Sequence, residues 1–295
     1  MVTISIIGVG RVGGAIALAV PAGKYSVNNL VYRNTTVDST VIKSLSLDGK
    51  VVPFDEIDGI SSDVVFITTR DAEIIPVSKA LVGKLSPNSI VFHTCGALSS
   101  SALDALRTAG HRTGSIHPLV SVSNPALGPE RFRGAYFCVE GHPAAVSIGQ
   151  EIATDLGGYP FTIDTEFKTL YHASAVTACG HLVALFDAAV EMMTKCGLSA
   201  AASKKILLPL VKSTVQNLGE QSTSAALTGT FARADIDTFT RHLTALNQYV
   251  SDDLLEIYLL LGERSLELAA KQGVSAERID RLRTKVSVAK SKLKW

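Results

Sequence analysis

Lys168 and His172 are the residues of this sequence best suited to move a proton. They are four residues apart, so a helix through this run would place an ammonium and an imidazole on the same face. Such a pair suits general acid–base chemistry, in which a positioned side chain gives or takes a proton as a bond is made. A surface lysine beside a core histidine would have the same spacing. The spacing also does not say which of the two residues would donate.

His117 is a third candidate for proton transfer, because it ends a β-rich run before Pro118 and would reach the same crevice. A lone histidine in such a place is more often structural. In the later part of the chain, Asn217 and Arg233 belong to the densest polar cluster, where Arg233 is best suited to hold an anionic substrate. A loop that is simply capped by Asp235 is the alternative interpretation of this cluster.

The chain begins with a glycine pattern that predicts a dinucleotide site. Gly8, Gly10 and Gly13 form G-x-G-x-x-G between a predicted strand and a predicted helix. The first glycine permits a tight turn, the second lets the backbone approach a pyrophosphate, and the third allows close packing of helix and strand. A helix that begins near Arg11 and Val12 would present unpaired N–H groups to the phosphates. A glycine-rich turn without a ligand is the alternative.

The end of the second predicted strand favours NADP(H) over NAD(H). An NAD site would place an acidic residue there to bind the ribose hydroxyls. This chain has Arg33, Asn34 and Thr35 instead, and its next carboxylate is Asp38. A guanidinium with amide and hydroxyl groups suits a 2′-phosphate, although a surface arginine would give the same pattern. We therefore expect NADP(H) as the cofactor.

Two further strand ends would face the same crevice, because ligands of open α/β sheets bind outside the carboxyl ends of the strands. One end carries Thr68 and Thr69, and the other carries His93, Cys95 and Gly96. Their small and hydroxyl side chains would leave room for a ribose and a nicotinamide. Local spacing places no base beside Cys95, so we interpret it as a wall residue and not as a nucleophile.

The elements that must position these residues follow from the pattern of apolar residues. Up to residue 164, β-rich runs alternate with helical stretches, which predicts parallel βαβ units. Strands are expected at 3–7, 30–33, 63–68, 89–93, 113–117, 135–140 and 159–163, and helices at 11–20, 74–84, 100–109 and 144–156. Later residues read as helices only, beginning with 165–196 and 200–218. We predict an α/β Rossmann domain with a mostly parallel, doubly wound sheet at 1–164, followed by an all-α domain at 165–295 for substrate binding and dimerisation.

The composition narrows the class of protein. Hydrophobic residues make up 46% of the 295 residues, and the formal net charge of +1 gives no reason to expect nucleic acid. The four cysteines occur singly, with no metal-ligand spacing, as in a reducing compartment. No uninterrupted apolar run approaches the ~20 residues that cross a bilayer. We expect a cytoplasmic protein without a metal, nucleic-acid or membrane partner.

Four stretches, GSIHPLVSV, KTLYHASAV, ILLPLVKSTVQNLG and AALTGTFARAD, resemble the 6-phosphogluconate dehydrogenase-like superfamily. Within it, the likeness is to bacterial proteins that pair an NADP-binding Rossmann-like domain with a helical domain of unknown function, and it covers nearly the whole chain. The resemblance implies that Lys168 corresponds to the superfamily lysine that handles the proton, with His172 in the place of an assisting amide. It also implies a homodimer formed through the helical domains. Thr230, Ala234 and the pair Cys179-Gly180 depart from the family pattern, which points to a specialised substrate or an altered activity.

Together these features predict an NADP(H)-dependent oxidoreductase that transfers a hydride to or from a small carbonyl, hydroxy or imine compound. The sequence leaves two alternatives open. One is an NADP(H)-binding sensor without catalysis, and the other is a deazaflavin-dependent NADP oxidoreductase.

Overall fold

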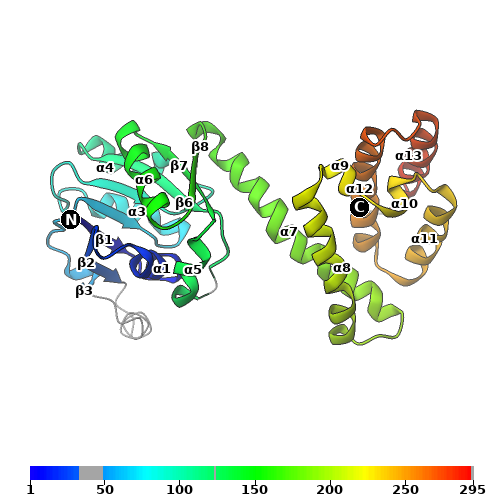
Figure 1. Ribbon diagram of the computed structural model, residues 1–295, viewed down its shortest axis with the longest axis horizontal. Helices are drawn as coiled ribbons and strands as arrows, with labels where there is room; N and C mark the ends of the chain where they lie inside the picture. The colour runs from blue at the N-terminus through cyan, green and yellow to red at the C-terminus, as the bar shows by residue number, and fades with distance from the viewer. Residues whose placement is uncertain (33–48, 123, 294–295) are drawn as a thin grey trace. The chain divides into compact units, whose positions relative to one another are not determined.

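The computed structural model describes residues 1–32, 49–122 and 124–293. The chain forms two compact units, Met1–Ala178 and Cys179–Trp295, and each is described by itself (Figure 1). The predicted boundary at residue 164 lies just before the long helix α7 (Lys168–Lys195), whereas the two units divide within that helix.

An eight-stranded sheet forms the centre of the first unit, counted over the described residues, in the order β3-β2-β1-β4-β5-β6-β7-β8. All neighbouring pairs among these strands are parallel except β6 and β7. The strand order reverses between β1 and β4, which is where open α/β sheets bind their ligands. The strands are β1 (Val2–Ile7), β2 (Tyr25–Tyr32), β3 (Lys50–Pro53), β4 (Val64–Ile67), β5 (Ile90–His93), β6 (Arg112–Pro118), β7 (Tyr136–Gly141) and β8 (Tyr159–Thr162).

Helices cover both faces of this sheet, because successive side chains of a strand point to opposite faces and both sets are apolar here. Ile6 and Phe66 belong to the core cluster under α1 (Arg11–Ala19), α5 (Gly128–Phe132) and α6 (Pro143–Asp155). Val65 and Ile67 belong to the cluster on the other face, with α3 (Asp71–Ala80), α4 (Asp104–Thr108) and the 3-10 turn η2 (Ser100–Leu103). Short 3-10 turns also occur at η1 (Phe54–Glu56), η3 (Pro125–Leu127) and η4 (Thr165–Phe167).

The predicted fold class is confirmed, and three details of the sheet were not predicted. β3 was not predicted, because two of its four residues are exposed and its sequence has no clear alternation. β2 begins at Tyr25, five residues before the predicted start, since its first half is a mixture of polar and apolar residues. The pairing of β6 with β7 is antiparallel, and this places His117 on β6 beside Cys138 on β7.

The second unit is helical throughout its regular elements. They are the remainder of α7, α8 (Ala200–Glu220), α9 (Thr223–Ala226), α10 (Gly229–Ala232), α11 (Ile236–Tyr249), α12 (Asp252–Lys271) and α13 (Ala276–Lys290). Phe239, Leu259 and Leu282 lie at the centre of its hydrophobic cluster. Gly197 follows α7 in the left-handed conformation (φ +88°), and Gly219 lies inside α8, which continues two residues beyond the predicted end at 218.

By length and composition alone, one helical stretch among the described residues, Thr165–Lys195, could cross a membrane. The sequence-based expectation considered only uninterrupted apolar runs, and this stretch is interrupted by polar residues such as His172. Apolar helices of water-soluble proteins pass the same test, so the helix by itself does not indicate a membrane.

Candidate functional site

The glycine turn after β1 has the geometry expected of a phosphate-binding turn. Gly8 adopts φ +98°, and a Cβ there would lie 2.9 Å from the backbone nitrogen of Thr69. A Cβ on Gly13 would lie 2.3 Å from Thr68 Oγ1, so α1 packs against the end of β4 only because this residue is glycine. Gly10 differs from both, since a Cβ there would meet no described atom within 4 Å. The turn is therefore tight at its two ends and open at Gly10.

The start of α1 offers hydrogen-bond donors to a ligand. Gly10 is its N-cap, and within the described residues no side chain caps the helix and no acidic residue lies in its first turn. The first N–H groups of a helix have no partner within the helix, so those of Arg11 and Val12 are suited to anionic oxygens. Thr69 Oγ1 is buried beside this turn without a hydrogen-bond partner among the described residues. These groups fit the phosphates and ribose of a dinucleotide, whereas the predicted Arg33, Asn34 and Thr35 lie outside the described residues.

A row of contacts runs along the carboxyl edge of the sheet, away from the glycine turn. The Thr68 hydroxyl donates to the Gly8 carbonyl oxygen at 2.6 Å, which joins the end of β4 to the turn. The Ser115 hydroxyl, on β6, donates to the carbonyl oxygen of Cys95 at 3.4 Å. Gly96 lies so close to two histidine rings that a Cβ on it would be 2.3 Å from His172 Cδ2 and 2.8 Å from His117 Nε2. The row therefore connects the predicted cofactor residues with two of the predicted proton-transfer residues.

His93 shapes the loop that follows β5. Its side chain is fully buried, and its Nδ1 accepts a hydrogen bond from the Cys95 backbone N–H at 3.2 Å. Its Nε2 therefore carries the proton and donates to the Ser99 carbonyl oxygen at 2.9 Å. Burial lowers the pKa of His93 to about 4, so the ring is neutral at pH 7. With both ring nitrogens bound to the loop, this side chain has no nitrogen left for a ligand.

Lys168 points into the protein and is only 1% exposed. Its Nζ lies 3.8 Å from Cys138 Sγ, on β7, and 5.4 Å from the centre of the Tyr171 ring. Burial lowers the pKa of Lys168, while the nearby Cys138 and Glu140 act in the opposite direction. A buried ammonium without a carboxylate in hydrogen-bonding contact gives up its proton more readily than a solvated one.

Glu140 holds the elements around Lys168 together. Its carboxylate accepts hydrogen bonds from the backbone N–H of Ser100 at 2.9 Å, from the Ser100 hydroxyl at 2.8 Å and from the Thr165 hydroxyl at 2.9 Å. These bonds join β7 to η2 and to the turn that leads into α7. This glutamate was not singled out from the sequence, because its partners are 25 and 40 residues away.

His117 lies between Tyr171 and His172. Its Nδ1 is 2.8 Å from the Tyr171 hydroxyl, and its ring meets that of His172 edge-on, with centres 5.8 Å apart. Burial, with a further effect of Lys168, lowers the pKa of His117 to about 3, so this imidazole is neutral at pH 7. Lys168 and His172 share a helix face as predicted, but Lys168 is directed to Cys138 while His172 is directed to His117. Tyr171 was not singled out from the sequence, although its spacing of three from Lys168 places it on the same helix face.

The two predicted substrate residues belong to the second unit. Arg233 ends α10 with an exposed side chain, and its carbonyl oxygen accepts a hydrogen bond from Arg278 at 2.8 Å. Asn217 lies in α8, where its carbonyl oxygen accepts from Gln221. The carboxylate of Asp235 accepts from the Thr238 backbone N–H at 2.9 Å, so the predicted N-cap of α11 is confirmed. The substrate roles of Asn217 and Arg233 stay predictions.

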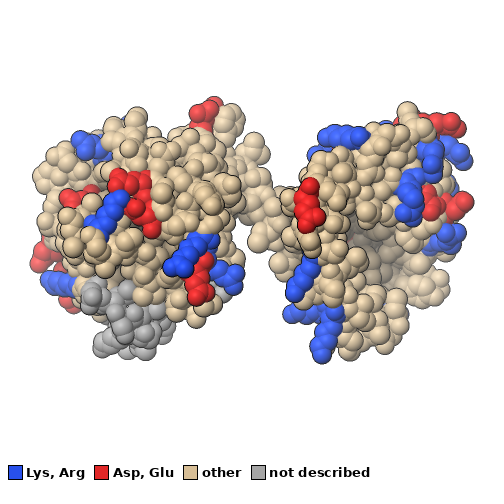
Figure 2. All heavy atoms as spheres, viewed as in Figure 1, with Lys and Arg blue, Asp and Glu red and all other residues tan. Residues whose placement is uncertain are grey.

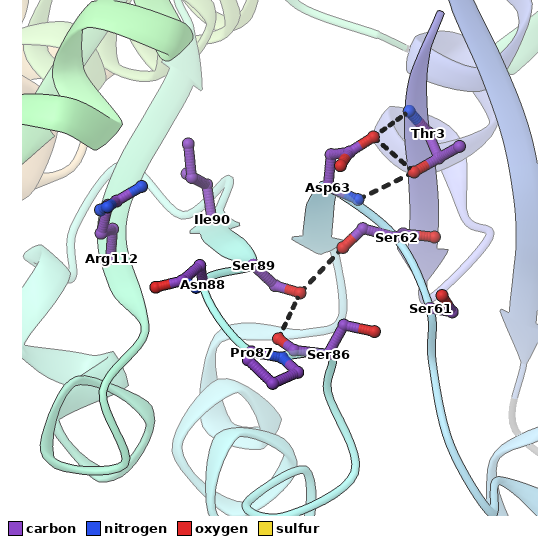
Figure 3. A pocket seen from close by; sticks show the side chains of 10 residues that line it. All are labelled: Thr3, Ser61, Ser62, Asp63, Ser86, Pro87, Asn88, Ser89, Ile90 and Arg112. Atoms are coloured by element: carbon purple, nitrogen blue, oxygen red, sulfur yellow. Dashed lines mark hydrogen bonds between the residues drawn. The ribbon is translucent and has the colours of Figure 1, made fainter.

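A separate hollow of about 310 Å³ lies at the opposite, amino-terminal edge of the sheet (Figure 3). The Asp63 carboxylate accepts from the backbone N–H and the hydroxyl of Thr3, and the Ser89 hydroxyl donates to the Ser62 carbonyl oxygen. These polar groups bind one another and tie β1, β4 and β5 together. We therefore assign this hollow a role in closing the end of the sheet and not in chemistry.

Comparison with known proteins agrees with this architecture. Residues 135–265 match a protein family described as a domain of unknown function, DUF2520. No curated protein matches the chain. Protein TM1727 from Thermotoga maritima has a TM-score of 0.71 and 23% identity, covering 91% of this chain and 99% of that one.

Two further solved structures carry descriptions of their activity. A putative NADP oxidoreductase, BF3122 from Bacteroides fragilis, has a TM-score of 0.71 and 18% identity, covering 90% of this chain and 98% of its own. A 1-pyrroline-5-carboxylate reductase from Streptococcus pyogenes has a TM-score of 0.57 and 17% identity, covering 96% and 98%. At these identities the likeness shows the fold, a Rossmann-like domain followed by a helical region.

Proposed function

We propose that this protein is an NADP(H)-dependent oxidoreductase that transfers a hydride to or from a small carbonyl, hydroxy or imine compound. One observation carries the proposal. Within a single unit, an open glycine turn and a largely buried group of proton-bearing side chains lie along the same carboxyl edge of the sheet. Hydride transfer needs both parts, a dinucleotide and a proton donor beside the atom that receives the electrons.

The residues of the turn would hold the cofactor. The backbone at Gly10 and the N–H groups of Arg11 and Val12 suit the pyrophosphate. The Thr69 hydroxyl, which has no hydrogen-bond partner among the described residues, suits a ribose or phosphate oxygen. We assign the 2′-phosphate to Arg33, with Asn34 and Thr35, from sequence reasoning. When bound, NADPH supplies a hydride. The description of BF3122 as a putative NADP oxidoreductase supports this choice of cofactor.

The proton would come from the group around His117. This histidine, His172 and the end of the row at Gly96 lie together, with Lys168 buried behind them. The name of the Streptococcus pyogenes protein, a reductase of a cyclic imine, supports an imine among the possible substrates. Arg233 and Asn217 remain our candidates for holding an anionic part of the substrate.

We also propose that the protein forms a homodimer through its helices. No residue of α8, nor of α7 beyond residue 178, belongs to the hydrophobic clusters of the described residues. Val183 is 69% exposed and Leu210 is 65% exposed. Residues 169–186 carry no charge, and the surface of α7 that faces the viewer in Figure 2 is correspondingly uncharged. A second copy of the chain would cover these side chains, and light scattering of the wild type and of Val183→Glu tests this.

Cofactor binding and turnover are tested separately. NADPH fluorescence titration should show binding to the wild type and tighter binding than of NADH. Gly10→Val should weaken binding at least tenfold, because the branched side chain would fill the approach to the turn. Gly23→Ala is the matched control, since Gly23 also has no described atom within 4 Å of a Cβ and lies outside the turn. Absence of NADPH binding by the wild type would rule out the proposal.

Oxidation of NADPH is then followed with 2-methyl-1-pyrroline and with cyclohexanone, an imine and a ketone. Turnover of either probe supports a reductase. Tight binding of NADPH without oxidation across a wider panel of carbonyl and imine compounds would instead support a sensor of the cofactor.

A further inference from the structure

Glu140 is a buried carboxylate on the face of the sheet that carries the proposed site. It lies two residues after Cys138 on β7, and residues two apart on a strand point to the same face. The antiparallel pairing places Glu140 beside Ser115 and Cys138 beside His117. Glu140 is only 1% exposed, so its negative charge has to be bound by groups inside the protein.

Three hydrogen bonds bind this charge, and they come from segments that border the site. The Ser100 backbone N–H donates to Oε1, and the hydroxyls of Ser100 and Thr165 donate to Oε2. Ser100 begins η2 and directly follows residues 94–99, which we call the Gly96 loop. Thr165 begins η4, three residues before Lys168. One carboxylate therefore joins β7, the end of the Gly96 loop and the turn that leads into α7.

The Gly96 loop is fixed at two further points. Both ring nitrogens of His93 bind its backbone, and the Thr169 hydroxyl, on α7, donates to the Ala97 carbonyl oxygen at 3.3 Å. The loop in turn packs against two histidine rings at Gly96, with no room for a Cβ. The positions of these rings therefore depend on the loop, and Glu140 ties the end of the loop to β7.

The charge of Glu140 also acts on Lys168 through space. Burial lowers the pKa of this lysine, and the negative charge of Glu140 raises it, which offsets part of the effect of burial. The other titratable groups that face Lys168 come from the strands, the loop and the helix around it: His93, Cys95, His117, Cys138 and Tyr171. Burial lowers the pKa of both histidines and raises that of both thiols and of the phenol, so all five are neutral at pH 7. Glu140 is therefore the one negative charge in this set of described residues.

We propose that Glu140 is the positioning residue of the site: it fixes the Gly96 loop and the start of α7 on β7, and its charge keeps Lys168 protonated. This role rests on the proposed reductase function, in which Lys168 takes part as an ammonium. A positive charge near the substrate favours the negative charge that develops on its oxygen or nitrogen as the hydride arrives, and it is also a source of the proton. Both oxygens of Glu140 are bound already, so it acts through Lys168 and the loop and not on the substrate.

Glu140→Gln separates the charge from the hydrogen bonds. Its amide oxygen can accept from the Ser100 backbone N–H, and its two amide hydrogens can be donated to the hydroxyls of Ser100 and Thr165, which turn to accept them. The urea midpoint should therefore stay close to that of the wild type. Glu140→Ala removes the acceptor of all three donors and should lower the midpoint. Thr165→Val keeps the charge and removes one of the three bonds.

NMR titration of the lysine side chains tests the effect of the charge without any substrate. Lys168 is identified by the signal that Lys168→Met lacks. In Glu140→Gln, this signal should titrate roughly one pH unit lower than in the wild type, because the carboxylate that favours the ammonium is gone. Glu151→Gln is the matched control, since Glu151 binds Lys24 at 2.6 Å, and it should leave the Lys168 signal unchanged. A Lys168 signal that follows the same course with pH in the wild type and in Glu140→Gln would overturn the proposal.

Kinetics with NADPH and cyclohexanone, which does not itself titrate, test the effect on the reaction. In the wild type, kcat should fall at high pH as Lys168 loses its proton, and in Glu140→Gln this fall should begin roughly one pH unit lower. Thr165→Val should lower kcat by about 10-fold at every pH without moving the fall, as expected for looser positioning. Below the fall, Glu140→Gln should recover most of the kcat that Glu140→Ala loses.

Three kinetic results would overturn the role of Glu140. They are a wild-type pH profile of kcat in Glu140→Gln, a wild-type kcat in Glu140→Ala, and equal losses of stability and kcat in both variants with an unmoved profile, which would mean a structural brace only. A wild type inactive with cyclohexanone and with 2-methyl-1-pyrroline would count against the proposed function. The NMR titration would then still decide whether Glu140 sets the charge of Lys168.

Discussion

Two lysines of the first unit lie over tyrosine rings at similar distances but in opposite environments. Lys24 Nζ is 5.6 Å from the centre of the Tyr25 ring, and Lys168 Nζ is 5.4 Å from that of Tyr171. Lys24 is 40% exposed and lies 2.6 Å from carboxylate oxygens of both Glu151 and Asp155. Lys168 is buried, and its hydrogen-bond partner is a thiol.

The partners decide what each ammonium can do. Hydrogen bonds to Asp155 and Glu151 raise the pKa of Lys24, so this lysine keeps its proton and joins the start of β2 to the end of α6. Burial lowers the pKa of Lys168, so this lysine is held in a place that favours release of its proton. The same pair of residue types thus braces the fold in one region, and in the other it holds a buried ammonium that we propose takes part in proton transfer.

Replacing Lys168 should have the largest effect on activity and an opposite effect on stability. Lys168→Met keeps the length of the side chain and removes the ammonium, so turnover of NADPH should fall at least ~100-fold. The free energy of unfolding should stay the same or rise, because a buried charge without a carboxylate partner is replaced by an apolar group. Lys24→Met should leave turnover unchanged and slightly lower the urea midpoint.

Two outcomes for the Lys168→Met variant would contradict the contrast with Lys24. Full turnover in Lys168→Met would show that the buried lysine is not part of the reaction. A large loss of unfolding free energy in the same variant, with a matching loss of activity, would show that Lys168 is a brace like Lys24. Urea unfolding and steady-state kinetics on the same preparations separate these outcomes.

A smaller effect on activity should follow from adding a side chain at Gly96, which packs against the histidines near Lys168. No such glycine contact is part of the surroundings described for Lys24. A Cβ there would lie 2.3 Å from His172 Cδ2 and 2.8 Å from His117 Nε2, and both rings are held by neighbours. In Gly96→Ala, displacement of these rings should lower turnover by roughly 10- to 100-fold and destabilise the fold by about 1–3 kcal/mol. Gly219→Ala, in an open position on α8, is the control and should be neutral. Wild-type kinetics in Gly96→Ala would place the reacting atoms away from His117.

Sequence reasoning reached the sheet, the glycine turn and the helix that carries Lys168, because these depend on local patterns. The three glycines and the short, continuously apolar strands such as Val64–Ile67 are visible within short windows. The direction of the Lys168 side chain cannot be predicted from such a window. Spacing along a helix shows which residues share a face, but it does not show what packs against that face.

Two of the residues that were missed, Cys138 and Glu140, depend on contacts between distant parts of the chain. Cys138 is 30 residues from Lys168 and lies beside His117 only through the antiparallel pairing of β6 with β7. Glu140 binds Ser100 across 40 residues. A mostly parallel sheet gave no reason to expect this antiparallel pair, so no sequence signal connected these side chains with the site.

The two lysines should also give opposite dependences of stability on pH. The lowered pKa of Lys168 means that the unfolded chain binds a proton more tightly, so its burial destabilises the fold at low pH and this penalty is relieved as pH rises toward 10.5. The stability difference between Lys168→Met and the wild type should therefore shrink over this range, by at most about 1.4 kcal/mol per pH unit. The raised pKa of Lys24 means that its contribution is fully present below 10.5, so the difference for Lys24→Met should stay constant from pH 7 to 10. If the stability difference from the wild type changed with pH in the same way for Lys168→Met and Lys24→Met, the two lysines would not differ in the sign of their pKa shifts.

A smaller effect than that of Gly96→Ala is expected at Asp155, the carboxylate that helps Lys24 brace the fold. Burial alone would raise the pKa of Asp155, but hydrogen bonds from Lys24 and Tyr25 lower it overall. Its contribution to stability is therefore present above the ordinary pKa of 3.8 and is lost as pH falls through the lower, folded value. Asp155→Asn should lower the urea midpoint at pH 7 by less than Gly96→Ala does, and the difference should vanish in strong acid, with turnover unchanged.

Asp104→Asn provides the matched comparison for that last variant, since Asp104 forms an exposed pair with Arg107 within one helix. Exposed pairs of this kind contribute little, so its midpoint should shift less than that of Asp155→Asn. Equal shifts in the two variants would mean that the carboxylates around Lys24 act as ordinary surface charges. The difference between the two lysines would then rest on the burial of Lys168 alone, because the partners of Lys24 would add nothing measurable to the fold.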